Sequence, residues 1–73
     1  MPQPEMNPVV SGNLASWGYD SSTEELYIEF HSGGLYVYSG VPTDIAEGLR
    51  EAPSKGQYHR DFIKGIYPYQ RVS

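Results

Sequence analysis

Residues 26–41 have the sequence LYIEFHSGGLYVYSGV, in which two apolar and aromatic runs flank a turn at residues 31–34. Alternation with period two on both sides of a glycine-containing break is typical of a β-hairpin. A two-residue turn would place the aliphatic side chains on one face and the tyrosines on the other. The predicted aliphatic face holds Leu26, Ile28, Phe30, Leu35 and Val37, and the predicted tyrosine face holds Tyr27, Tyr36 and Tyr38 with Glu29 and His31. The aliphatic face requires a core, whereas the tyrosine face fits a core, a protein interface or a ligand-stacking surface.

The chain has 73 residues and no cysteine, so we expect a single domain without a disulfide or a thiolate metal site. A domain this small buries only about 60% of its unfolded surface, and self-association is a natural way to bury more. We therefore expect a homo-oligomer. No apolar run approaches the roughly 18 residues of a membrane span, and the first residues do not resemble a signal peptide, so we expect a cytoplasmic protein with no membrane partner.

Residues 1–10 contain three of the six prolines and show no periodicity, which predicts a flexible N-terminal tail before a single domain at residues 11–73. Residues 14–19 are predicted to form a first strand, and a turn cluster at residues 20–23 separates it from the hairpin. Short turns allow only antiparallel pairing, so the sequence predicts a three-stranded β-meander.

The period changes after Pro42, where apolar residues recur at helical spacing until Pro53 ends the pattern. Ser54 and Gln57 then form a capping box that opens a second short helix. Tyr58 and Phe62 are expected on its apolar side. The predicted fold class is therefore α+β, with the three-stranded antiparallel meander packed against one or two short helices.

The net charge is −4, but its distribution is uneven: residues 1–49 contain seven acidic residues and no Lys or Arg, whereas all five basic residues lie in residues 50–73. An acidic chain with so few cations is a poor partner for long nucleic acid. Catalytic chemistry also finds little support, since the two histidines are 28 positions apart and no glycine-rich phosphate loop is present. We therefore expect no enzyme activity, no metal and no cofactor.

Several short motifs occur in an order that resembles the KTSC domain, a family named for the C-terminal domain of some lysyl-tRNA synthetases. These motifs are Gly18-Tyr19-Asp20, Tyr36-Val37-Tyr38, Val41-Pro42, Ser54-Lys55-Gly56 and Tyr67-Pro68-Tyr69. The resemblance implies a compact α+β module and says little about activity, although RNA binding has been suspected for the family. An asparagine is common in the family near position 59–60, where this chain has His59-Arg60.

Nucleotide binding has the best physical support from the residues themselves. Exposed aromatic rings stack on bases, and helix N-termini and cations bind phosphate. The predicted ligand-binding residues are Tyr36, Tyr38, Ser54, Lys55, Gly56, Tyr58, His59, Arg60 and Lys64. The expected ligand is a free or cyclic nucleotide or a short RNA, as in a phage-type nucleotide-sequestering protein. The alternative is a protein-interaction or self-association module that uses the tyrosine face and binds no nucleotide.

Overall fold

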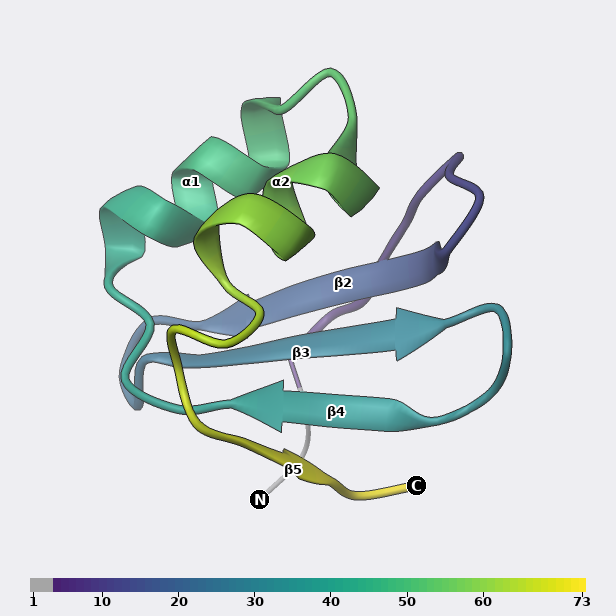
Figure 1. Ribbon diagram of the computed structural model, residues 1–73. Coiled ribbons are helices and arrows are strands. Elements are labelled where there is room, and N and C mark those ends of the chain that lie inside the picture. Colours follow the sequence, from purple (N-terminus) through teal and green to yellow (C-terminus); the bar gives the residue numbers. More distant parts are fainter. Residues whose placement is uncertain (1–3) are drawn as a thin grey trace.

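Two helices cover one face of an antiparallel five-stranded sheet in this computed structural model, which describes residues 4–73 (Figure 1). The strands lie in the sheet in chain order, β1-β2-β3-β4-β5, and both helices come between β4 and β5 in the sequence. The elements are β1 (Asn7–Pro8), β2 (Leu14–Asp20), β3 (Glu25–Phe30), β4 (Leu35–Tyr38), α1 (Thr43–Glu51), α2 (Lys55–Phe62) and β5 (Tyr69–Arg71). The α+β class is confirmed, but the prediction of three strands was wrong, because β1 and β5 extend the meander at its two edges.

The turn between β3 and β4 is closed by a pair between Phe30 and Gly34, so its loop has three residues, 31–33, instead of the predicted two. The Phe30 N–H donates to the Gly34 carbonyl at 3.2 Å, and the Gly33 N–H donates to the Phe30 carbonyl at 3.0 Å. Both glycines have positive φ, +99° and +102°, which a residue with a side chain rarely adopts. This loop shifts the register by one residue relative to the prediction, so that Leu26 pairs with Tyr38.

The shift in register overturns the predicted division of the hairpin into an aliphatic and a tyrosine face. Tyr36 and Tyr38 lie on the helix-covered face with Leu26 and Ile28, whereas Val37 lies on the opposite face. Tyr38 is only 4% exposed and belongs to the core. The tyrosines of β4 therefore do not form a separate surface.

Proline residues set the limits of the first helix, as the sequence predicted. Pro42 is the N-cap of α1, and Ala52, immediately before Pro53, is its C-cap. The second helix starts at the predicted capping box, because the Ser54 hydroxyl accepts a hydrogen bond from the Gln57 N–H at 3.3 Å. Both helices are thereby positioned at their N-termini by local sequence.

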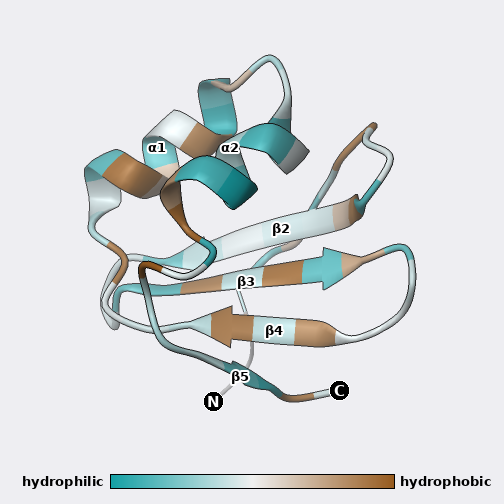
Figure 2. Ribbon diagram, in the orientation of Figure 1, coloured by the Kyte–Doolittle hydropathy of each residue, from teal (hydrophilic) through white to brown (hydrophobic). Residues whose placement is uncertain are grey.

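The core lies between the sheet and the helices, and apolar segments of β3 and α1 mark it in Figure 2. Its buried residues are Leu14, Trp17, Leu26, Ile28, Tyr38, Val41, Leu49 and Ile63. The expectation that Tyr58 and Phe62 lie on the apolar side of α2 is confirmed for Tyr58, which is partly buried and packs against the core, and was wrong for Phe62. His59 and Ile63 point inward, and Phe62 is 50% exposed.

The N-terminal segment pairs with the sheet where the sequence predicted a flexible tail. Strand β1 pairs with β2, and the Asn7 side-chain amide donates to the Trp17 carbonyl at 3.1 Å. Residues 4–6 lie over Gly18, where a Cβ would be 2.8 Å from the Glu5 carbonyl oxygen. Gly18 thus lets this segment approach the sheet on the face opposite the helices (Figure 1). The first three residues of the predicted tail lie outside the described part of the chain.

Candidate functional site

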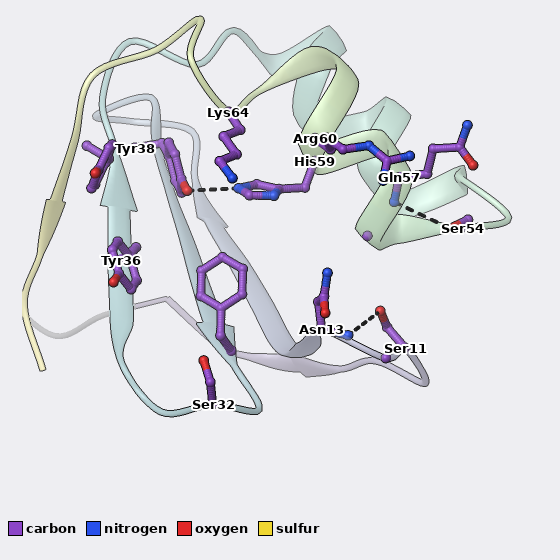
Figure 3. Close-up of a pocket in the computed structure, with 14 residues that line it drawn as sticks. Ser11, Asn13, Ser32, Tyr36, Tyr38, Ser54, Gln57, His59, Arg60 and Lys64 are labelled. Carbon is purple, nitrogen blue, oxygen red and sulfur yellow. Dashed lines mark hydrogen bonds between the residues drawn. The ribbon is translucent and has the colours of Figure 1, made fainter.

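A cleft of about 650 Å³ lies between helix α2 and the helix-covered face of β3, β4 and β5 (Figure 3). One wall is aromatic and is made by Phe30, Tyr36 and Tyr69, with Tyr38 below them. The opposite wall is polar and comes from α2 and the turn after it, through Ser54, Gly56, Gln57, His59, Arg60 and Lys64. The loop at residues 11–13 and Ser32 close one end.

Three strands contribute to the aromatic wall: Phe30 comes from β3, Tyr36 from β4 and Tyr69 from β5. Tyr38 lies on the same face as Tyr36, because side chains two positions apart on a strand share a face. The rings of Phe30 and Tyr36 meet edge to face at 5.3 Å between centroids. Tyr69 on β5 lies 5.5 Å from Tyr36 and 5.6 Å from Tyr38. The Arg71 guanidinium lies over the Tyr36 ring at 5.9 Å. Tyr69 is 60% exposed, so its ring is accessible to a ligand.

The polar wall begins at the N-terminus of α2. A Cβ on Gly56 would lie 3.3 Å from the Ser11 hydroxyl, so the absence of a side chain lets the loop at residues 11–13 approach the helix. Further along, Arg60 forms an exposed ion pair with Asp61 at 3.6 Å. Lys64 takes part in neither of the two ion pairs found within residues 4–73. This wall therefore offers hydroxyl groups, backbone amides and two cations to the cleft.

The floor of the cleft is a buried pair formed by Tyr38 and His59. The Tyr38 hydroxyl lies 2.8 Å from His59 Nε2, and the two residues are 4% and 7% exposed (Figure 3). Burial lowers the pKa of His59, and the nearby Lys64 cation lowers it further. Burial also raises the pKa of Tyr38 to about 12, with smaller effects from Tyr69 and Tyr36. Both partners are therefore neutral at pH 7.

Seven of the nine predicted ligand-binding residues line this one cleft: Tyr36, Tyr38, Ser54, Gly56, His59, Arg60 and Lys64. The sequence placed them on two distant segments, and the packing of α2 against β4 brings them together. Whether they bind a ligand stays a prediction. Tyr38 and His59 are buried at the floor, so neither offers the exposed ring that was expected of Tyr38.

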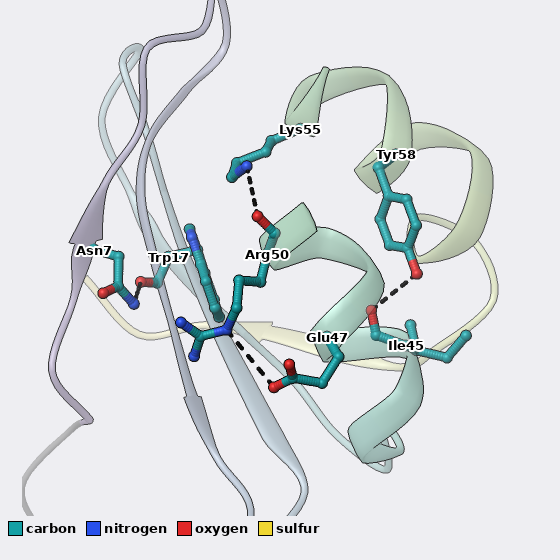
Figure 4. A network of polar contacts seen from close by, with 7 residues as sticks. All are labelled: Asn7, Trp17, Ile45, Glu47, Arg50, Lys55 and Tyr58. Carbon is teal, nitrogen blue, oxygen red and sulfur yellow. Dashed lines mark hydrogen bonds and ion pairs between the residues drawn. The ribbon is translucent and has the colours of Figure 1, made fainter. Parts of the chain in front are cut away.

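Lys55 and Tyr58 do not line the cleft, and their side chains extend from α2 to α1 (Figure 4). The Lys55 ammonium donates to the Arg50 and Ala52 carbonyls at 3.0 and 3.1 Å, which satisfies free carbonyl groups at the C-terminal end of α1. The Tyr58 hydroxyl donates to the Ile45 carbonyl at 2.9 Å. These two predicted residues therefore do not line the cleft with the other seven, and both have structural partners.

The same region also holds a second cationic contact away from the cleft. The Arg50 guanidinium lies over the Trp17 ring at 5.3 Å and pairs with Glu47 at 3.6 Å (Figure 4). The Arg50 side chain is thus held by contacts with Trp17 and Glu47 and does not reach the cleft. Of the basic residues in the C-terminal third, Arg60 and Lys64 are the ones that line the cleft.

Sequence reasoning missed several cleft residues, namely Ser11, Gly12, Asn13, Phe30, Ser32, Gln57 and Tyr69. Phe30 was assigned to an aliphatic face, and the register of the hairpin brought it beside Tyr36 instead. Tyr69 carried a signal, since it belongs to the apolar and aromatic segment at residues 66–69 and to the Tyr67-Pro68-Tyr69 motif. The loop at residues 11–13 had no signal beyond its turn-forming composition.

The lining of the cleft contains no carboxylate among the residues that the structure describes, although the whole chain has a net charge of −4. Its charged side chains are Arg60 and Lys64. The acidic residues lie elsewhere, so the cleft is a locally cationic site on an acidic protein. Residues 4–73 hold no group of three metal-ligating side chains, and no helix among them is long and apolar enough to cross a membrane.

These features define a small α+β domain with two helices over one face of an antiparallel sheet and an aromatic, cationic cleft between the layers. The chain belongs to the KTSC domain family, because the sequence pattern of the KTSC domain matches residues 10–67. Its structure is similar to the crystal structure of a KTSC domain protein from Yersinia pestis, with a TM-score of 0.92 and 33% sequence identity over 94% of this chain and 97% of that one.

The domain also occurs within much longer proteins. The chain is 45% identical over 60 residues to a lysine–tRNA ligase of Trichormus variabilis, and the match covers 82% of this chain but 11% of the ligase. It is 40% identical over 63 residues to an uncharacterized protein of Stutzerimonas stutzeri, covering 85% of this chain and 89% of that protein. The chain therefore spans about a ninth of the ligases that it matches.

Proposed function

We propose that this KTSC domain is a non-catalytic binding protein that takes a nucleotide ligand, either free, cyclic or within a short RNA, in the cleft between α2 and the sheet. The observation that carries this proposal is the composition of the cleft. Aromatic rings form one wall and two cations with a helix N-terminus form the other, with no carboxylate in the described lining. A nucleotide has the matching parts, a planar base and an anionic phosphate.

The base would stack on the aromatic wall. Tyr69 is 60% exposed, and Tyr36 beside it is half-buried, so both rings are held in place while part of their surface stays accessible. Base–aromatic stacking contributes roughly 1–3 kcal/mol per base and tolerates any base. The wall therefore supports binding of a base without fixing which one.

The phosphate would bind at the opposite wall. Arg60 lies on α2 and Lys64 lies four residues later, in the turn after it, and both are exposed. The N-terminus of α2 adds the backbone amide of Gly56. Two cations suffice for one or two phosphates, whereas long nucleic acid requires many phosphate contacts. The cleft therefore favours a nucleotide or a short oligonucleotide. Similarity to lysine–tRNA ligases, which are named for an RNA substrate, agrees with a ligand of this chemistry.

The test is a thermal-shift screen of the protein against mononucleotides, cyclic dinucleotides and short RNAs, at low and moderate salt. A ligand at 100 times its Kd should stabilise the fold by about 2.7 kcal/mol, which is several degrees in a domain of this size. Lys64→Gln should weaken the shift, and Lys55→Gln is the matched control, because Lys55 does not line the cleft. Flat curves across the panel would overturn the proposal.

Self-association is a second candidate function, which the free edge of the sheet favours. Strand β5 is an edge strand with all three residues exposed, and Tyr69 and Val72 are 60% and 50% exposed. Two copies could pair β5 against β5 around a two-fold axis. The opposite edge, β1, has two residues, of which Pro8 lacks an N–H donor. Such pairing would close at a dimer. The molar mass from light scattering, with and without an Arg71→Pro substitution that removes an N–H facing the free edge of β5, tests it.

A further inference from the structure

The proposed nucleotide site contains a buried polar side chain, His59, in which one of the two ring nitrogens has a hydrogen-bond partner within the fold. The ring is 7% exposed, and its Nε2 has a hydrogen-bond partner in Tyr38. The other ring nitrogen, Nδ1, has no hydrogen bond to any of residues 4–73, and Figure 3 shows it directed into the cleft. A buried imidazole therefore offers one free polar atom to whatever occupies the cleft.

The partners of Nε2 determine what Nδ1 can do. The Tyr38 hydroxyl is buried, and His59 Nε2 is the one acceptor recorded for it among the described residues. If Nε2 carried the imidazole proton, the Tyr38 proton would have no acceptor, which is unfavourable for a buried hydroxyl. The Lys64 side chain also reaches toward the Nε2 side of the ring (Figure 3), and its cation disfavours a proton there. Tyr38 therefore donates to Nε2, and the proton of the neutral ring lies on Nδ1.

We infer that Tyr38 holds His59 as its Nδ1–H tautomer, and that this N–H donates to an acceptor atom of the bound base, a carbonyl oxygen or a ring nitrogen, so that His59 is a specificity-determining residue. The inference rests on the proposed nucleotide function. The base is the favoured partner because of the position of His59. Its Nδ1 side faces the floor near Phe30, whose ring lies 5.4 Å from that of His59 between centroids. The cations lie elsewhere: Arg60 is exposed at the rim, and Lys64 reaches toward the Nε2 side of the ring (Figure 3).

A phosphate and a base have different requirements at such a position. A phosphate keeps its charge only where cations or solvent compensate it, and both are available at the rim. A neutral donor between aromatic rings suits a neutral acceptor in the plane of a stacked base. Stacking on Tyr36 and Tyr69 places the edge of a base toward the floor, while the phosphate remains with Arg60 and Lys64.

Two amide substitutions separate the two sides of the histidine ring. In His59→Asn the amide nitrogen occupies the position of Nδ1, so the donor to the cleft is kept and the Tyr38 contact is lost. In His59→Gln the longer side chain reaches the position of Nε2, so the Tyr38 contact is kept and the donor to the cleft is lost. We expect His59→Gln to weaken the binding of nucleosides about tenfold and His59→Asn to weaken it by less. Equal affinity of His59→Gln and the unsubstituted protein would overturn the inference.

Long-range ¹H–¹⁵N spectra of the ¹⁵N-labelled protein test the tautomer without any ligand. The Nδ1–H form is expected at pH 7, and the Nε2–H form would overturn the inference. The probes are then adenosine, guanosine, cytidine and uridine, their 5′-monophosphates, and inorganic phosphate. Nucleosides and nucleotides, but not inorganic phosphate, should shift the Nδ1 resonance.

The outcomes distinguish the two proposals. A shift of Nδ1 with inorganic phosphate as large as with nucleotides would place His59 in the phosphate site, which overturns the base contact and leaves nucleotide binding intact. Shifts of other cleft resonances by nucleotides without a response from Nδ1 would have the same meaning. No response of any cleft resonance to any probe would overturn nucleotide binding itself, and with it the role of His59.

Discussion

The ring of Tyr58 lies across Gly48, at the point where helix α2 meets helix α1. A Cβ at position 48 would be 2.7 Å from Tyr58 Cζ, well inside van der Waals contact. The ring is fixed there because its hydroxyl donates to the Ile45 carbonyl at 2.9 Å and its face packs on Phe62 at 4.7 Å between centroids. The two helices, and therefore the polar wall of the cleft, depend on the absence of a side chain at Gly48.

We predict that Gly48→Ala destabilises the domain although alanine is the better helix former. Alanine in a helix interior is favoured over glycine by about 1 kcal/mol. Here the new methyl group would displace the Tyr58 ring and break its hydrogen bond, and overpacking of this kind costs about 1–3 kcal/mol. Urea denaturation should show a net loss of free energy of unfolding of about 1 kcal/mol.

The control for Gly48→Ala is the same substitution in a Tyr58→Ala background. Without the ring, the Cβ at position 48 meets no obstacle from Tyr58, so the substitution should stabilise the domain by up to about 1 kcal/mol. A stabilising effect of Gly48→Ala in the presence of Tyr58 would contradict the packing described for the two helices.

We predict that substitutions of Ser54 separate stability from binding, because this serine caps α2 and also lines the cleft. Ser54→Ala removes the acceptor for the Gln57 N–H and should cost about 1 kcal/mol in urea denaturation. Ser54→Asp keeps an N-cap acceptor, so stability should be retained. Its carboxylate would repel a phosphate, and nucleotide binding measured by calorimetry should weaken. Unchanged nucleotide affinity in Ser54→Asp would place the phosphate away from this end of the cleft.

Local signals in the sequence were sufficient for the main elements of the fold. Prolines at positions 42 and 53 limit α1, and Ser54 caps α2 through a contact three residues away. The length of the β3–β4 loop could not be predicted, because Gly33 and Gly34 both tolerate positive φ and allow two- or three-residue loops. That one-residue difference reverses which face every side chain of β4 occupies.

Features that depend on tertiary packing could not be predicted from the sequence. Strands β1 and β5 are two and three residues long and are strands only because they pair with the edges of an existing sheet. His59 was expected among the ligand-binding residues, and its burial depends on Tyr38, 21 positions earlier, which supplies its partner. The candidate site was partly predictable, since charge pattern and the capping box identify the polar wall, whereas the contribution of Phe30 required the true register.

We predict that the domain loses stability as the pH falls below about 6.5, because the pKa of His59 is lowered in the folded state by burial and by Lys64. Between the folded pKa and the ordinary value of 6.5, the unfolded chain binds a proton that the folded chain does not, so the free energy of unfolding rises with pH. Tyr38, which also faces this ring, is neutral in this range, and Phe30 on the other side does not titrate. Urea denaturation at pH 5 and pH 7 measures the difference.

Two asparagine variants identify the histidine responsible for the acid effect. His59→Asn should remove most of the loss between pH 7 and pH 5, because no buried imidazole remains. His31→Asn is the matched control, since His31 is exposed in the β3–β4 loop. If the acid dependence followed His31 instead, the burial of His59 would not be its cause.

We predict a late step in the alkaline titration of the protein that belongs to Tyr38, whose pKa burial raises to about 12. Between the ordinary value of 10.0 and this one, the unfolded chain has released a proton that the folded chain keeps, so stability falls as the pH rises through this window. A shift of this size corresponds to roughly 2–3 kcal/mol of stability, present below pH 10 and lost by about pH 12. The ultraviolet absorbance of tyrosinate follows the step, and Tyr38→Phe should abolish it. Tyr36→Phe is the control because its ring is only half-buried, and a late step that persists in Tyr38→Phe would assign it to another tyrosine.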